Sequence, residues 1–174
     1  MTDASTADDL PNDWGPRLAD LARRKATSQE MGGPEKIAKH HARGSDTVRE
    51  RLDHLLDAGT FRELGPLVGA VPADGLVTGW GRINGRPVLV GAEDFTVLGG
   101  SIGSGNSAKR YRVAELALQE RVPLVMILEG AGHRPAMPGD PIHTRAPSDL
   151  IAQAKLAGHV PFVTAVRGAS AGHG

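Results

Sequence analysis

The sequence predicts an α/β fold preceded by a helical region, and three observations lead to this prediction. Residues 124–128 form an uninterrupted apolar run, which is typical of a strand in a parallel sheet covered on both faces, and residues 162–166 are expected to form a second buried strand. A helix is expected between them, capped by Ser148 and ended by Gly158. The links between strand, helix and strand are short, which favours right-handed crossovers.

The composition restricts what the protein can bind. Its 174 residues include 20 Lys+Arg and 20 Asp+Glu, and a chain without net charge is a poor candidate for binding nucleic acid. The absence of cysteine excludes disulfides and thiolate metal sites. Residues 1–10 are polar rather than signal-like, and no apolar run is long enough to span a bilayer. We therefore expect a cytoplasmic protein with no metal and no nucleic-acid or membrane partner.

The amino-terminal third is predicted to be helical. Residues 1–32 are interpreted as a polar leader with one short amphipathic helix, because Trp14, Leu18 and Leu21 repeat at helical spacing. Residues 33–58 then provide two helices. The first is a basic helix over residues 35–43, and the second begins at the capping-box pair Thr47 and Glu50.

The α/β core is expected over residues 74–174. Residues 76–83 and 86–91 are predicted strands joined by Asn84-Gly85, a pair that favours a two-residue type I′ turn. A glycine-rich loop follows over residues 99–105, and a helix is expected from about residue 107 to 121. Residues 103–108 also resemble a dinucleotide fingerprint, but a hairpin precedes them instead of the start of a βαβ unit, so this hypothesis is the weaker one.

The turns that follow the two apolar strands are the candidate site. Small residues there leave backbone N–H groups unshielded, and two such turns on neighbouring strands can direct these groups at one oxygen atom. This arrangement is an oxyanion hole built from backbone alone. The candidate donors are the amides of Gly132 and His133 in the first turn and of Gly172 and His173 in the second. Turns of this composition also serve packing alone, and the pattern by itself leaves the two interpretations about equal.

Three separated stretches carry a family resemblance. They are residues 33–57, residues 77–101 and Gly168-Ala-Ser-Ala-Gly172, in matching order and spacing. They resemble the amino-terminal part of the β subunit of propionyl-CoA and acetyl-CoA carboxylases, the biotin-dependent carboxyltransferase family with a crotonase-like fold.

The resemblance implies transfer of a carboxyl group from carboxybiotin to the α-carbon of a short acyl-CoA. Biotin would arrive on a separate carrier protein, coenzyme A would be part of the substrate, and this chain would supply the acyl-CoA half-site. The implied partners are a biotin carboxylase and carrier subunit and further copies of the chain. The expected substrate-binding residues are Gly99, Gly100, Ser101, Lys109, Arg110, Ala131, Arg134 and Ala171.

Some features leave alternatives open. The family's first turn usually reads Ser-Gly-Gly-Ala-Arg, so His133 stands where alanine is expected, and His173 stands at a usual glycine. Lys36, Lys39 and Arg43 could also meet the CoA phosphates, although a plain charged surface is the simpler interpretation. Arg134 could equally be an anchor of its loop. Because family subunits hold two crotonase-like domains, the simplest expectation is a truncated product or a fragment. Another crotonase-like enzyme, such as a decarboxylase or hydratase, and a non-catalytic remnant remain alternatives.

Overall fold

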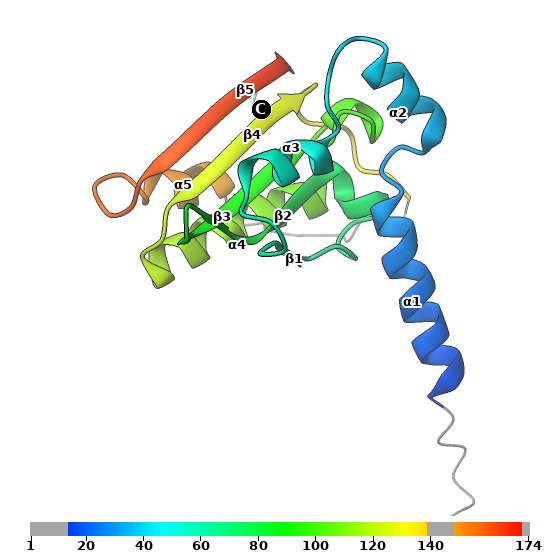
Figure 1. Ribbon diagram of the computed structural model, residues 1–174, viewed down its shortest axis with the longest axis horizontal. Helices are drawn as coiled ribbons and strands as arrows, with labels where there is room; N and C mark the ends of the chain where they lie inside the picture. Colours follow the sequence, from blue (N-terminus) through cyan, green and yellow to red (C-terminus); the bar gives the residue numbers. More distant parts are fainter. Residues whose placement is uncertain (1–13, 139–147, 172–174) are drawn as a thin grey trace, which may run out of the picture.

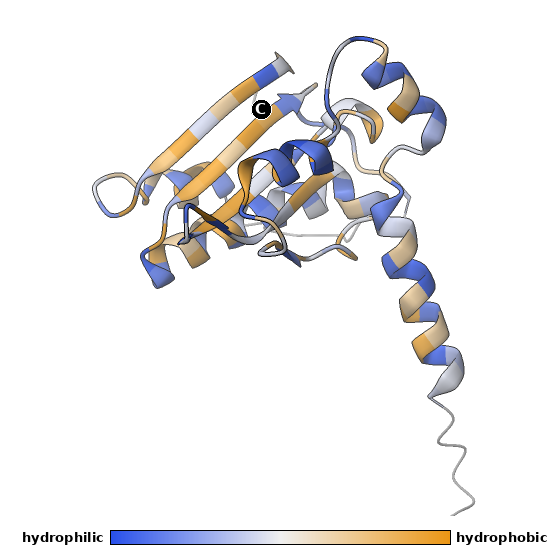
Figure 2. Cartoon of the chain, in the orientation of Figure 1, coloured by the Kyte–Doolittle hydropathy of each residue, from blue (hydrophilic) through white to orange (hydrophobic). Residues whose placement is uncertain are grey.

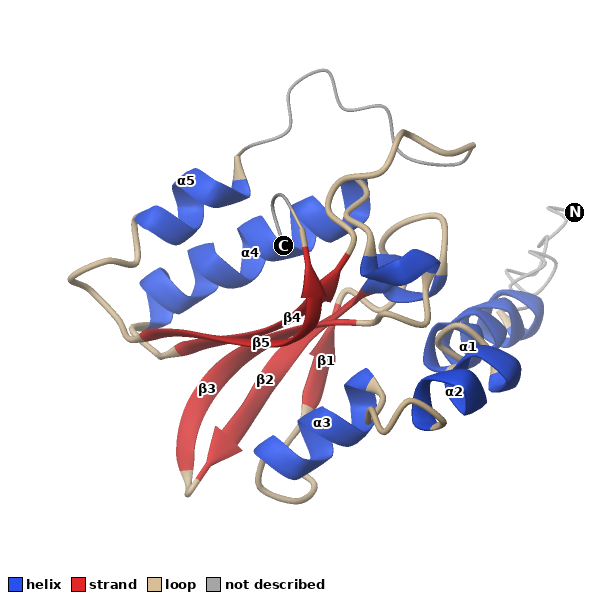
Figure 3. Ribbon diagram, turned by 90° about the horizontal axis from the view of Figure 1, so that it is seen from above, coloured by secondary structure: helices blue, strands red, loops and turns tan. Residues whose placement is uncertain are grey.

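A five-stranded mixed sheet organises the computed structural model, which describes residues 14–138 and 148–171. The strand order is β1-β2-β3-β4-β5, with antiparallel pairing from β1 to β3 and parallel pairing from β3 to β5. Helices α4 and α5 cover one face of the sheet, and α3 lies on the other (Figures 1 and 3). The strands are β1 (Arg62–Leu64), β2 (Leu76–Ile83), β3 (Arg86–Glu93), β4 (Leu124–Gly130) and β5 (Phe162–Ser170). The α-helices are α1 (Gly15–Gln29), α2 (Pro34–His41), α3 (Val48–Leu55), α4 (Ser104–Glu120) and α5 (Asp149–Ala154), and the short 3-10 helices are η1 (Pro72–Gly75) and η2 (Leu98–Gly100).

The three amino-terminal helices lie beside and beneath the sheet. Helix α1 extends away from the body of the molecule, and Trp14 and Leu18 are more than half exposed (Figures 1 and 2). Helix α3 begins with the predicted capping box, because the Thr47 hydroxyl accepts from the Glu50 amide while the Glu50 carboxylate accepts from the Thr47 amide. Among the described residues, no helix is both long and apolar enough to cross a membrane.

The predicted hairpin is confirmed. Strands β2 and β3 pair along their whole length, and the turn residues Asn84 and Gly85 have φ angles of 50° and 77°, as a type I′ turn requires. Both turn amides donate to the carboxylate of Asp57, at 3.0 and 2.7 Å. The loop after α3 therefore fixes the turn from the side.

Strands β3 and β4 lie between two apolar clusters. Along β3, Val88 and Val90 face α3, while Leu89 between them faces α4. Along β4, Leu124 and Met126 pack towards α4 in the same alternating manner. The cluster on the α4 side also contains Leu76, Val113, Ala114, Ala117, Val122, Ala152, Leu156 and Val160. The cluster on the α3 side also contains Val48, Leu52, Leu56, Ala73, Val77, Ala92 and Ile127.

Strand β5 corrects the prediction of a second buried strand. It pairs in parallel with β4, as expected, but Phe162, Val163 and Val166 are 39%, 53% and 59% exposed (Figure 2). The physical reason is its position at the edge of the described sheet, with α5 packed chiefly on α4 rather than over β5. The run of apolar residues therefore predicted a strand correctly and its burial wrongly.

Candidate functional site

The turns that follow β4 and β5 lie against each other. The Ala171 amide donates to the carbonyl of Gly130 at 3.1 Å, and a Cβ atom added at Gly132 would lie 2.9 Å from the Ala171 carbonyl oxygen. Gly132 also has a φ of 80°, a conformation that side chains disfavour. Position 132 therefore needs glycine both for its backbone conformation and for the close approach of the second turn. Gly172 and His173 lie outside the described residues.

The glycine-rich loop holds the first turn from its other side. The Ile102 amide donates to the Gly132 carbonyl at 2.8 Å, and the Arg134 amide donates to the Ile102 carbonyl at 3.0 Å. These two bonds form a parallel bridge between Ile102 and His133. In such a bridge the amide of His133 itself points away from Ile102. The bridge to Ile102 therefore does not use the amide of His133.

Five of the expected substrate-binding residues form the rest of this contact, namely Gly99, Gly100, Ser101, Ala131 and Arg134. The Ala131 amide donates to the Gly99 carbonyl at 3.0 Å. A Cβ at Gly100 would lie 2.3 Å from the carbonyl oxygen of Glu129, so backbone packs directly on backbone here. The carbonyl of buried Ser101 accepts from Arg134 Nη1 at 2.7 Å. The structure thus brings residues 99–101, 131–134 and Ala171 together in one junction.

Arg134 is an anchor of its loop in this structure. Its guanidinium forms an ion pair with Asp74, and the two side chains are 9% and 0% exposed. A Cβ at Gly103 would lie 2.2 Å from the guanidinium, so a side chain at this position would displace Arg134 from its present position.

A cationic groove opens next to the junction. It has a volume of about 260 Å³ and includes Gly99, whose carbonyl binds Ala131. Exposed cations of α2 and of the residues just after it line one wall. On the other wall the ring of Phe95 stacks on His40, with centroids 6.0 Å apart. The lining residues are Lys36, Lys39, His40, Arg43, Phe95, Thr96, Leu98 and Gly99.

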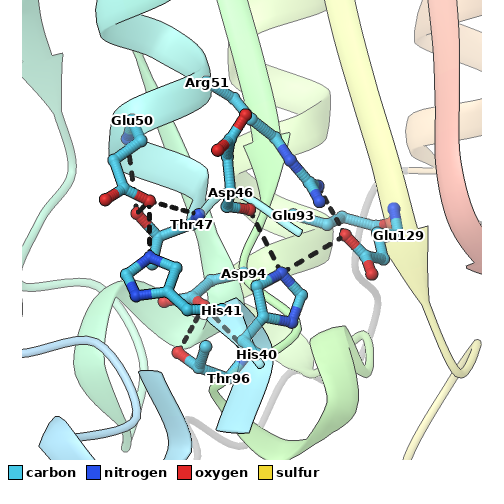
Figure 4. Close-up of polar contacts among 10 residues, drawn as sticks. All are labelled: His40, His41, Asp46, Thr47, Glu50, Arg51, Glu93, Asp94, Thr96 and Glu129. Atoms are coloured by element: carbon cyan, nitrogen blue, oxygen red, sulfur yellow. Dashed lines mark hydrogen bonds and ion pairs between the residues drawn. The ribbon is translucent and has the colours of Figure 1, made fainter. Parts of the chain in front are cut away.

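His40, which lines the groove, also belongs to a buried ionic cluster (Figure 4). Glu129 forms an ion pair with Arg51 at 2.5 Å, and His40 Nε2 lies 3.9 Å from the same carboxylate. The Glu129 amide donates to the Glu93 carboxylate at 2.6 Å. Burial raises the pKa of Glu93, although Arg110 beside it acts in the opposite direction. This cluster fixes the end of β4 just before the junction.

The carboxyl group of Asp94 belongs to the same region. It accepts from both the amide and the hydroxyl of Thr96, and burial raises its pKa. Asp94 therefore has its own hydrogen-bond donors next to Phe95 and Thr96, which line the groove.

Comparison with known proteins identifies the family. Residues 39–174 match the model of the family described as "Carboxyl transferase domain". The chain belongs to this carboxyl transferase family. The propionyl-CoA carboxylase beta chain of Saccharopolyspora erythraea is 42% identical over 129 residues, which are 68% of this chain and 24% of the relative. The methylmalonyl-CoA carboxyltransferase 12S subunit of Propionibacterium freudenreichii subsp. shermanii is 36% identical over 167 residues, 90% of this chain and 32% of the relative.

A solved structure agrees with the sequence relatives. The transcarboxylase 12S hexamer, crystallised with methylmalonyl-coenzyme A and methylmalonic acid, matches with a TM-score of 0.74 at 33% identity, over 91% of this chain and 33% of that one. This similarity confirms the crotonase-like α/β fold and the resemblance to carboxyltransferase β subunits. The chain spans about a quarter to a third of the length of the curated relatives described above.

Lys109 and Arg110 do not lie where the sequence placed them. They were expected to meet the CoA phosphates, but only 5% and 2% of their surfaces are exposed. Lys109 Nζ donates to the carbonyls of Ala73 and Leu76, and Arg110 forms an ion pair with Glu93. Helix α4 begins at Ser104, three residues before the expected start, and places both side chains against the sheet. Their cationic groups are therefore occupied inside the carboxyl transferase fold and are not directed at a ligand.

Most of the buried acids and their partners could not be predicted from local sequence patterns. The spacing of Asp94 and Thr96 is typical of a local side-chain turn, which could have been recognised. The pairing of Glu129 with Arg51, and of Asp74 with Arg134, joins residues far apart in the chain, so no local pattern signals either. No group of three or more potential metal ligands occurs within residues 14–138 and 148–171.

Proposed function

We propose that this chain supplies the acyl-CoA half-site of a biotin-dependent carboxyltransferase, which moves a carboxyl group to the α-carbon of a short acyl-CoA. The observation that carries the proposal is the junction of the two turns, where Gly132 and Ala171 meet without an intervening side chain. The names of the relatives support the substrate class, since they include a propionyl-CoA carboxylase and a methylmalonyl-CoA carboxyltransferase.

The proposed chemistry of the junction is stabilisation of negative charge. When the α-carbon of an acyl thioester loses its proton, charge develops on the thioester oxygen. The amides of Gly132 and His133, with those of Gly172 and His173, would donate to this oxygen. Removing one such donor typically costs about 3–4 kcal/mol of transition-state stabilisation. Carboxybiotin on its carrier would release its carboxyl group to the α-carbon, and the biotin left behind would take up the proton from that carbon. Ala131 and His133 are exposed, so the outer side of the turn is open to an approaching molecule.

The cationic groove is the proposed place for the phosphates of coenzyme A. Lys36, Lys39 and Arg43 are exposed around it, whereas Lys109 and Arg110 are buried in internal contacts. The groove adjoins the junction at Gly99, so one extended ligand could occupy both. A biotin carrier subunit and further copies of the chain are the proposed protein partners. The hexamer of the similar transcarboxylase 12S supports assembly with further copies.

A glycine pair offers a matched test of the proposal. Gly132 and Gly158 both have positive φ angles, 80° and 77°, but a Cβ at Gly158 would meet nothing within 4 Å. Both Gly→Ala variants therefore carry similar backbone strain, and only Gly132→Ala disturbs the junction. We expect propionyl-CoA to raise the thermal unfolding temperature of the wild-type chain, and carboxylation with a carboxybiotin-loaded carrier to fall at least tenfold in Gly132→Ala only.

The same assays decide against the alternatives. Activity on methylmalonyl-CoA without any biotin donor would indicate a decarboxylase, and hydration of an enoyl-CoA would indicate a hydratase. A cooperative transition that no acyl-CoA shifts would refute the proposal and leave a folded remnant.

A further inference from the structure

Asp74 has an unusual backbone conformation at a fully buried position. Its φ is 49°, and its neighbours Ala73 and Gly75 also have positive φ, at 46° and 68°. Non-glycine residues held in this region cost on the order of 1 kcal/mol or more each and persist only when their surroundings enforce them. The side chain of Asp74 is 0% exposed. The unusual backbone conformation therefore occurs at the residue that carries a buried carboxylate.

Two glycines form the slot that holds this carboxylate. A Cβ at Gly69 would lie 2.5 Å from the Cβ of Asp74, and a Cβ at Gly105 would lie 2.9 Å from Asp74 Oδ2. Lys109 also donates to the carbonyl of Ala73, at 2.9 Å, which ties the strained turn to α4. The carboxylate is thus fixed by close packing on both sides.

The two oxygens of Asp74 have separate partners. Oδ2 accepts from the amide of Asn106 in the first turn of α4, at 2.5 Å. Oδ1 forms the ion pair with the Arg134 guanidinium. A single rigid carboxylate therefore connects the start of α4 to the residue that follows His133.

Arg134 links Asp74 to the turn through both its side chain and its backbone amide. Its side chain is held by Asp74 and by the Ser101 carbonyl, and its own amide belongs to the bridge with Ile102. Because His133 is its direct neighbour, a displacement of Arg134 would rotate the peptide groups of the turn. Misplacement of a catalytic group by about 1 Å can lower a rate about 100-fold.

We infer that Asp74 is a positioning residue, which acts through Arg134 to direct the amides of Gly132 and His133 at the thioester oxygen. The inference rests on the proposed function of those amides. Asp74 touches no substrate in this account. Its role is to keep the turn from rotating when charge develops on the substrate oxygen.

The test uses propionyl-CoA labelled with ¹³C at the thioester carbonyl. In the wild-type chain the bound carbonyl signal should move downfield, because hydrogen bonds from the turn polarise the carbonyl. In Asp74→Asn and in Arg134→Met this shift should shrink, and kcat should fall about 10- to 100-fold while KM for propionyl-CoA stays within about twofold. Arg134→Lys, which keeps a charge near Asp74, should recover part of both. The double variant should be no worse than the more damaging single variant, because both act through one contact.

A second ion pair provides the matched control. Arg49 and Glu63 pair at 3.0 Å with side chains 20% and 11% exposed, and they tie α3 to β1 away from the junction. Arg49→Met should lower the unfolding temperature without changing the carbonyl signal. If Asp74→Asn fails to fold, as circular dichroism would reveal, the Arg134 variants carry the test.

The outcomes separate the inference from the proposed function. If folded Asp74→Asn and Arg134→Met keep the wild-type carbonyl shift and kcat, Asp74 is structural only and the inference is overturned. If the wild-type chain binds no acyl-CoA, the proposed function fails, and amide hydrogen exchange then measures the turn directly. Faster exchange at Ile102 and Arg134 in Asp74→Asn than in Arg49→Met would support the positioning contact, and equal exchange would overturn it.

Discussion

The cations of α2 and those of α4 have opposite surroundings within one chain. Lys36, Lys39 and Arg43 are exposed around a groove. Lys109 and Arg110 are buried, with their cationic groups bound to backbone carbonyls and to Glu93. Both sets lie near a glycine-rich loop, so proximity to such a loop does not make a cation a phosphate ligand. A cation is available to a phosphate only if its N–H donors are not already bound by partners within the fold.

The largest effect should come from breaking the buried pair of Arg110 and Glu93. Arg110→Met leaves a buried carboxylate without its cation, and the free energy of unfolding should fall by about 3–5 kcal/mol in urea titrations at pH 7. Burial raises the pKa of Glu93, so protonation of this group is more favourable in the folded chain than in the unfolded chain. Stability from this group is therefore present at low pH and lost as pH rises through the folded pKa. The deficit of Arg110→Met should consequently shrink as pH is lowered.

The double variant Arg110→Met/Glu93→Gln is the control for this pair, because it also removes the uncompensated charge. It should recover part of the lost stability. A single variant as stable as wild type would place Arg110 with the exposed cations and break the distinction.

A smaller and pH-dependent effect is expected at Lys109. Burial lowers the pKa of Lys109 from 10.5 to about 8. Between those values the unfolded chain binds more protons than the folded one, so this group makes the free energy of unfolding rise with pH, by at most about 1.4 kcal/mol per pH unit. Lys109→Met should remove this slope. Urea titrations of both proteins between pH 7.5 and 10 measure it, and parallel curves would contradict the burial of the ammonium group.

The smallest effect on stability should come from the α2 cations. Lys36→Gln/Lys39→Gln should change the free energy of unfolding by less than about 0.5 kcal/mol. The same variant should weaken binding of propionyl-CoA about tenfold in calorimetric titrations, with a smaller loss at high salt.

The matched comparison for the α2 variant is Arg112→Gln/Lys155→Gln, which removes two exposed positive charges from the region of α4 and α5. Equal affinity loss in both double variants would show a general charge effect rather than a phosphate site.

Local rules predicted much of the fold. Asn84-Gly85 gave the hairpin and Thr47 with Glu50 gave the start of α3, because the partners in each case are close in sequence. The prediction that β5 is buried was wrong, because a largely apolar segment indicates a strand but not which elements cover that strand. Within the site, the need for small residues at position 132 followed from the turn, and the structure shows the close approach of Ala171 that requires them.

The remaining site residues depended on contacts that no local pattern contains. An Asp-Gly pair at residues 74–75 signals a turn, but the partner of Asp74 is 60 residues further along the chain. Lys109 and Arg110 followed a glycine-rich loop as anion-binding residues often do, and only the packing of α4 on β2 and β3 reveals their internal partners.

The two-residue turn between β2 and β3 also has a kinetic consequence. It closes the smallest loop in the sheet, whereas the parallel pairs β3–β4 and β4–β5 each require a long crossover to close first. Isolated hairpins form in about 1–10 μs, and long-range parallel pairing is slower. We expect refolding to begin at this hairpin, with early protection of the amides of Val88 and Val90 in pulse-labelling experiments. Earlier protection of β4 would show instead that collapse of the central strands starts the process.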